Sequence, residues 1–171
     1  MKKIFLTMII TLMGVSMGFS QKFAFVDTEY ILGRIPAYEA AQKQLDKFSA
    51  DWQKEIETGM AEVEKMYKNY QAERVLLTED MRTKREDEII NREKAVKGLQ
   101  KSYFAPEGQL YKKRQELVKP IQDQVFNAIK ELATEGNYDV IFDTASGATM
   151  LFTNPRYDKS DAVLEKMGIS N

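Results

Sequence analysis

The chain of 171 residues contains no cysteine and no histidine. Without cysteine it forms no disulfide, offers no thiol nucleophile and has no site for the lipid of a bacterial lipoprotein. Without histidine it lacks the commonest metal ligand and the side chain most used for acid–base chemistry near neutral pH. An enzyme built on this sequence would have to rely on carboxylates, lysine or tyrosine alone.

Catalytic motifs are also missing from the sequence. It contains no glycine-rich phosphate loop, no nucleophile elbow and no metal-ligand spacing. Five aspartates lie at or near predicted strand and helix ends, and one interpretation makes them a carboxylate cluster: Asp27, Asp139, Asp143, Asp158 and Asp161. Aspartate in such places more often ends a strand or caps a helix. We therefore expect no enzymatic activity and no cofactor.

Charge of one sign is not in excess, because 25 basic and 26 acidic side chains give a formal net charge of −1. This balance provides no electrostatic basis for binding nucleic acid, and we expect no such partner. Residues 68–101 are slightly basic, whereas residues 36–67 are slightly acidic. The difference is small and typical of solvated helix faces, but it also fits transient contact with an anionic partner or a membrane surface.

The N-terminal residues 1–20 have the features of a secretory signal peptide. Lys2 and Lys3 precede an uncharged apolar run from Ile4 to Phe19, and Gly18 and Ser20 are small residues before a cleavage site at Gln21. A membrane anchor is the alternative, but the run is shorter than the ~20 residues of a spanning helix. We expect cleavage and export across a membrane.

Two short apolar segments lie on either side of about a hundred residues that contain few turn-forming residues. Residues 23–27 and 138–143, followed by 148–152, are rich in β-branched and aromatic side chains and predict strands. Residues 36–136 are mostly good helix formers. The sequence thus predicts an α+β protein with a β-rich body from residues 21–35 and 137–171, and a helical hairpin arm between them.

The first half of the arm is predicted to be one helix that begins at Pro36, a residue well tolerated at the first helical position. Its apolar side chains recur every three or four residues: Leu45, Phe48, Trp52, Ile56, Met60, Val63, Tyr67 and Tyr70. Gly59 interrupts this stripe and weakens the helix. The pattern ends near Leu76, so we expect the tip at residues 74–82, with Thr78 capping the returning helix.

The second half of the arm follows a heptad pattern that is typical of an antiparallel coiled coil. The heptad positions are Ile89, Val96, Tyr103, Leu110 and Leu117. Pro106 and Pro120 predict kinks, because each removes a helical N–H donor. Gly136 and Asn137 predict the end of the arm.

Three short strands are too few for a covered core, and a lone small sheet is marginally stable. Self-association around the sheet would bury it, so we expect an oligomer. The candidate oligomerisation residues are Phe23, Phe25, Val26, Val140, Ile141, Phe142 and Leu151. On the arm, methionine and aromatic side chains either pack one helix on the other or contact a partner. The candidates for partner contact are Met66, Tyr70, Met81, Phe104 and Tyr111.

The ordered set of these features resembles the Skp/OmpH family of periplasmic chaperones. The resemblance covers essentially the whole mature chain. It rests on residues 25–27 with Ile31, Leu32 and Pro36, on 41–45, on 117–121 with Ala128 and Ile129, on 136–143, and on 158–161 with Val163 and Leu164.

The resemblance implies a homotrimer in which a small β body, contributed by three chains, carries long helical-hairpin tentacles around a cavity. It implies an ATP-independent holdase whose partners are unfolded outer-membrane β-barrel proteins. This chain departs from the family pattern in two ways. The best-known relatives are strongly basic, whereas this chain is slightly acidic. Pro106 and Gly108 also add an interruption to the second half of the arm. A structural or adaptor coiled-coil protein of the envelope, which docks one defined partner, is the alternative.

Overall fold

The computed structural model describes residues 21–147 and 150–169. The predicted signal peptide, residues 1–20, and positions 148 and 149 of the predicted third strand lie outside the described residues. Contacts divide the chain into two compact units. The hairpin unit is Glu29–Asn127, and the sheet unit joins the segment up to Thr28 with the segment from Ala128 onward.

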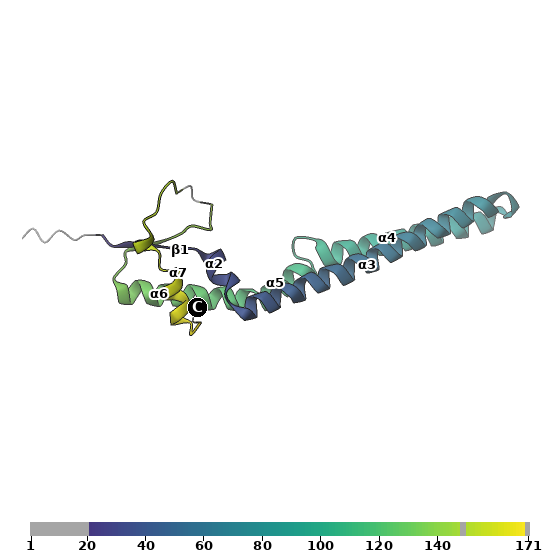
Figure 1. The fold of residues 1–171 in the computed structure, drawn as a ribbon. Coiled ribbons are helices and arrows are strands. Elements are labelled where there is room, and N and C mark those ends of the chain that lie inside the picture. The colour runs from purple at the N-terminus through teal and green to yellow at the C-terminus, as the bar shows by residue number, and fades with distance from the viewer. Residues whose placement is uncertain (1–20, 148–149, 170–171) are drawn as a thin grey trace, which may run out of the picture. The chain divides into compact units, whose positions relative to one another are not determined.

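The hairpin unit begins in α2, Thr28–Gly33, and continues into the long helix α3, Pro36–Glu73. Pro36 occupies the start of α3, as predicted, after Ile35 in an extended conformation. A 3₁₀ turn, η1 at Arg74–Leu76, reverses the chain into α4, Glu79–Phe104. Figure 1 shows α3 and α4 side by side along the hairpin. Thr78 caps α4 by accepting a hydrogen bond from the backbone N–H of Met81, which confirms its predicted role.

The core of the hairpin is narrow and has one very close approach. Leu45, Ile56, Tyr70 and Val96 are buried. At Gly59, an added Cβ would lie 2.7 Å from Cγ2 of Val96, closer than real atoms approach. Gly59 therefore has a packing reason that the sequence alone does not reveal, since its missing side chain lets α3 approach α4 at this level.

The second half of the hairpin is divided into separate helices rather than being one helix with two kinks, as predicted. α4 ends at Phe104, α5 spans Gln109–Leu117 and α6 spans Lys119–Gly136. The turn at residues 105–108 closes with a hydrogen bond from Gly108 N–H to the carbonyl of Ala105, at 2.8 Å. A Cβ on Gly108 would lie 2.8 Å from two backbone oxygens, so this turn requires glycine. Pro120, by contrast, lies in the first turn of α6, where no helical donor is lost.

Among its described residues the sheet unit contains two strands, β1 at Phe23–Val26 and β2 at Val140–Asp143, which pair in parallel. The predicted third strand is wrong for residues 150–152, which are not in a strand. β1 already has β2 on one side and an isolated bridge to Asp158 on the other, where Lys159 donates its N–H to Phe25. Leu151 is 95% exposed, so within the described residues this segment has no strand to join.

The end of α6 and the C-terminal helix complete the sheet unit. Asn137, at φ 48°, ends α6 as predicted, and Tyr138 N–H bonds back to the carbonyl of Ala133. α7, Ser160–Lys166, begins where Asp158 accepts a hydrogen bond from Ser160 N–H.

The last turns of α6 belong to the sheet unit rather than to the arm. Lys166 of α7 pairs with Glu135 at 2.7 Å and Glu131 at 3.6 Å, and Lys22 donates to the carbonyl of Gly136. The hydrogen bond to Glu135 raises the pKa of Lys166. These contacts join the end of α6 to the sheet unit, which resumes at Ala128, whereas the sequence suggested that the arm runs to residue 136.

Candidate functional surfaces

The two strands present one face of large apolar side chains to solvent. Alternation along each strand places Phe23 and Phe25 on the same side, and the register sets Val140 and Phe142 beside them. The rings of Phe25 and Phe142 stack with centroids 5.8 Å apart. Phe23, Val140 and Phe142 are exposed and Phe25 is half-buried. We call these four residues the aromatic sheet face.

The opposite side of the sheet is the interior of the unit, and here one predicted oligomerisation residue is corrected. Val26 is only 2% exposed, and Ala24 is fully buried. Val26 therefore packs within its own chain, because its position in β1 points it away from the aromatic sheet face. Ile141 pairs in register with Ala24 on this inner side and is half-buried.

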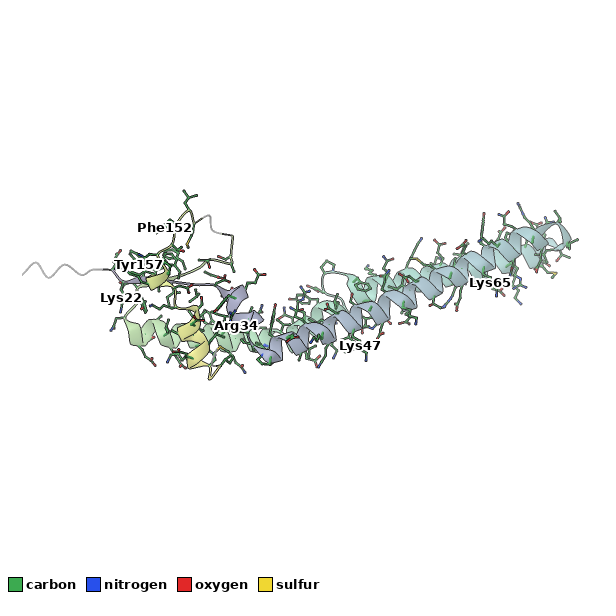
Figure 2. All side chains as sticks on the ribbon, in the orientation of Figure 1. Lys22, Arg34, Lys47, Lys65, Phe152 and Tyr157 are labelled. Carbon is green, nitrogen blue, oxygen red and sulfur yellow. The ribbon has the colours of Figure 1, made fainter. Side chains whose placement is uncertain are left out.

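Two further aromatic residues of the sheet unit, Tyr157 and Phe152, were not among the residues predicted to form a site. Tyr157 lies with its ring centroid 6.3 Å from that of Phe23. Phe152 follows Leu151 in the loop after β2, and both are highly exposed. Figure 2 labels Phe152 and Tyr157 in the sheet unit. The apolar run at residues 150–152 was a usable signal for Phe152, whereas the contact of Tyr157 depends on the fold.

The aspartates near the strands serve local structure. Asp143 accepts hydrogen bonds from the N–H and hydroxyl of Thr28, at 3.2 and 2.8 Å, and so caps α2 from a distant strand. Asp139 accepts from the N–H of Lys22 at 2.8 Å. Buried Ser160 accepts from the N–H of Asp27 at 2.9 Å. In the described part of the chain, no group of three carboxylates is placed to hold a metal ion.

The predicted partner-contact residues of the hairpin differ in accessibility. Met81 and Tyr111 are exposed, and Met66 is half-buried. Tyr70 is only 7% exposed and its hydroxyl donates to the carboxylate of Glu86 across the hairpin, which raises the pKa of Tyr70. The prediction that Tyr70 contacts a partner is therefore corrected, because its ring packs in the hairpin core.

Phe104 belongs to an aromatic cluster opposite the break in the second arm. Trp52 stacks on Tyr103 with ring centroids 4.8 Å apart, and Phe104 meets Trp52 edge-on at 6.4 Å. Phe48 also stacks on Trp52, with ring centroids 5.5 Å apart. The Tyr103 hydroxyl donates to Glu55 at 2.9 Å, and this bond raises its pKa. The cluster holds α4 on α3 just before the helix ends.

Between the close approach at Gly59 and the tip, the helices leave an apolar groove of about 400 Å³. Exposed Met60 and Tyr67 lie on one wall, and buried Val96 lies at one end. The lining residues are Met60, Val63, Glu64, Tyr67, Ile89, Glu93, Val96 and Lys97. The groove gives the hairpin an adaptable apolar surface.

Comparison with known protein families shows the family to which this chain belongs. A family model described as outer membrane protein (OmpH-like) matches residues 22–167. The chain belongs to the OmpH-like family. The match covers both the sheet unit and the hairpin unit, and the family is that of the outer-membrane-protein chaperones to which the sequence was compared above.

A solved structure agrees with this membership at the level of the fold. It comes from Caulobacter crescentus and is described as a proposed outer membrane chaperone (OmpH-like). The TM-score is 0.67, with 12% identity over 85% of this chain and 83% of that chain. A search of curated proteins found no match. In the part of this OmpH-like chain that the structure describes, no helix is long and apolar enough to cross a membrane.

Proposed function

We propose that this OmpH-like protein is an ATP-independent periplasmic holdase that binds unfolded outer-membrane proteins between its helical arms and prevents their aggregation. The observation that carries the proposal is the match of nearly the whole chain to this chaperone family. The long hairpin, with exposed methionine and tyrosine side chains along it, supports the same conclusion. Export by cleavage of residues 1–20 is part of the proposal.

The working form is proposed to be a homotrimer assembled through the sheet units. The aromatic sheet face exposes large apolar side chains, each of which gains roughly 1 kcal/mol or more on burial. β2 is an edge strand of a two-stranded sheet, and an unpaired edge favours addition of another strand. The exposed segment at residues 150–152 is the natural candidate to supply that strand from a second copy.

Client capture would follow from many weak contacts. An unfolded β-barrel protein exposes apolar side chains and unpaired backbone groups, both of which promote aggregation. Several hairpins around one space hold such a chain through contacts that are individually weak and collectively effective. Exposed Met81 and Tyr111, with Met60 and Tyr67 of the groove, are the proposed contacts on the hairpin. Release follows mass action toward a tighter-binding destination.

Light scattering tests the holdase activity. A porin unfolded in urea is diluted into buffer with and without the mature protein, and the scattering should fall toward zero at a small excess of assembled chaperone. A monomeric variant of the aromatic sheet face should protect less at equal chain concentration, because separate hairpins lose multivalency. Unchanged aggregation with excess wild-type protein would reject the proposal.

An envelope adaptor that docks one partner is the second candidate. The groove favours it, because a discrete apolar recess suits a defined ligand better than a diffuse surface does. Crosslinking in envelope extract separates the two functions. One dominant stoichiometric partner supports the adaptor, whereas many barrel proteins support the holdase.

A further inference from the structure

The tip of the hairpin exposes two adjacent apolar side chains, Val75 and Leu76, that neither the fold nor the proposed client contacts explain. Val75 and Leu76, in η1, are each 83% exposed. Met81, one turn into α4, is also exposed, and Leu77 between them is half-buried. Consecutive exposed apolar residues at the end of a projecting element indicate a surface that meets an apolar environment.

The tip is held in a fixed conformation. Leu77 N–H donates to the carbonyl of Arg74 at 3.4 Å, and Nε of Arg82 donates to the same carbonyl at 3.0 Å. The guanidinium of Arg82 also pairs with Glu79 at 3.2 Å. Because these bonds and the Thr78 cap fix the turn, presenting Val75 and Leu76 to a partner costs little further ordering.

We propose that residues 74–82 are an interfacial membrane contact that inserts Val75 and Leu76 among the headgroups and upper acyl chains of a lipid bilayer. The exposed area argues for lipid rather than protein, since three side chains on a convex turn offer far less than the ~800 Å² per partner that a stable protein interface buries. A bilayer accepts a small convex apolar insertion.

The charge of the tip sets the kind of membrane contact. Residues 74–82 carry two basic and two acidic side chains, Arg74 and Arg82 with Glu79 and Asp80. The net charge of this segment is therefore zero, and the Arg82 guanidinium is already paired with Glu79. Attraction to anionic lipid is not the driving force, so binding depends on apolar burial and is insensitive to salt. In the proposed oligomer, several tips would bind one membrane together.

Fluorescence of a tryptophan placed at the tip tests the proposal. The chain has a single tryptophan, Trp52, far along α3 from the tip, so Leu76→Trp in a Trp52→Phe background reports on the tip alone. With vesicles of phosphatidylcholine, the emission should shift to the blue and be quenched by brominated lipid. The shift should persist at high salt and when phosphatidylglycerol is added.

Variants of the otherwise wild-type mature protein give the second readout, in vesicle flotation. The double change Val75→Ser and Leu76→Ser should lower partitioning by about tenfold or more, because both inserted side chains are lost. Tyr67→Ser is the matched control, since it removes an exposed apolar side chain from the shaft of the hairpin, and it should leave partitioning unchanged. Circular dichroism should show equal helix content in all three proteins.

Four outcomes would overturn the proposal. These are no emission shift, a shift only with anionic vesicles that salt abolishes, equal partitioning of the double variant, or a shift produced by unfolded porin but not by vesicles. The last would assign the tip to the client. The proposal stands apart from the holdase function, because the double variant should still suppress porin aggregation. A wild-type protein that binds vesicles without suppressing aggregation would reject the holdase alone.

Discussion

Phe25 and Phe142 occupy the same register position of β1 and β2, and their rings stack on the outer face of the sheet. Ala24 and Val26, which alternate with Phe25 along β1 and lie on its opposite face, are buried. One strand thus provides both the interior of the sheet unit and the outer aromatic sheet face. The two faces have different roles, and substitutions on them should have different effects.

Phe142→Asp should dissociate the oligomer, because it places a charge on a face proposed to be buried between copies. Sedimentation equilibrium of the mature protein measures the result, and the variant should have the mass of a single chain. Gln100→Asp adds the same charge at an exposed position of α4 and should leave the assembled mass unchanged. An assembled mass for Phe142→Asp would contradict the interface.

Val26→Ala should lower the free energy of unfolding by about 2 kcal/mol, since the side chain is buried and its removal leaves a cavity. The identical change Val75→Ala, at an 83% exposed position, should alter it by no more than about 0.5 kcal/mol. Urea unfolding at one fixed protein concentration compares the two. Equal effects would show that Val26 is not in the interior of the sheet unit.

Gly59→Ala should destabilise the hairpin by about 1–3 kcal/mol despite the better helix propensity of alanine, because its Cβ would overlap Cγ2 of Val96. Gly98→Ala is the control, as an added Cβ at Gly98 meets nothing within 4 Å. It should stabilise α4 by up to about 1 kcal/mol. Thermal unfolding that shows stabilisation by both substitutions would disprove the close approach of the helices.

Alkaline pH should destabilise the fold. Tyr70, Tyr103 and Lys166 all have a raised pKa, chiefly because each donates a hydrogen bond to a glutamate. A raised pKa in the folded state means that the folded chain holds these protons more tightly, so the stabilisation is full below the unfolded values, 10.0 for tyrosine and 10.5 for lysine. It is lost as pH rises through the folded values.

Urea midpoints across this alkaline range measure the effect. Tyr103→Phe removes one titrating donor, so its midpoint should fall less steeply with pH than that of the wild type. Gln100→Ala, at an exposed position of α4 without a titrating side chain, should keep the wild-type slope. Tyrosinate absorbance locates each ionisation independently. If the urea midpoint of Tyr103→Phe falls with pH as steeply as that of the wild type, the bond to Glu55 does not contribute to the loss of stability at alkaline pH.

Local signals in the sequence were sufficient for the long helices and for several of their ends, but not for the division of the second arm into α4, α5 and α6. Pro36 begins α3 through its fixed φ, at a position where its missing N–H costs no helical hydrogen bond. Thr78 at the cap of α4 and Asn137 after α6 likewise act within a few residues, so the sequence context predicts all three. The β-branched and aromatic side chains of residues 23–27 and 138–143 likewise predicted strands, which the structure places at Phe23–Val26 and Val140–Asp143. The ordered set of these signals was also enough for the family.

Tertiary structure decided what depends on contacts between distant residues. Alternation along β1 places Val26 and Phe25 on opposite faces, but only the folded sheet unit shows that Val26 is buried and Phe25 faces outward. Tyr70 follows the same rule, since its burial depends on where α4 returns. From the sequence, Gly59 only weakens the helix. In the structure its missing side chain makes room for Val96 of the facing helix. The sequence determined the long helices and the two paired strands, because those preferences are local. The fold determined which faces remain exposed and that residues 150–152 are not in a strand, because burial and strand pairing depend on pairs of segments.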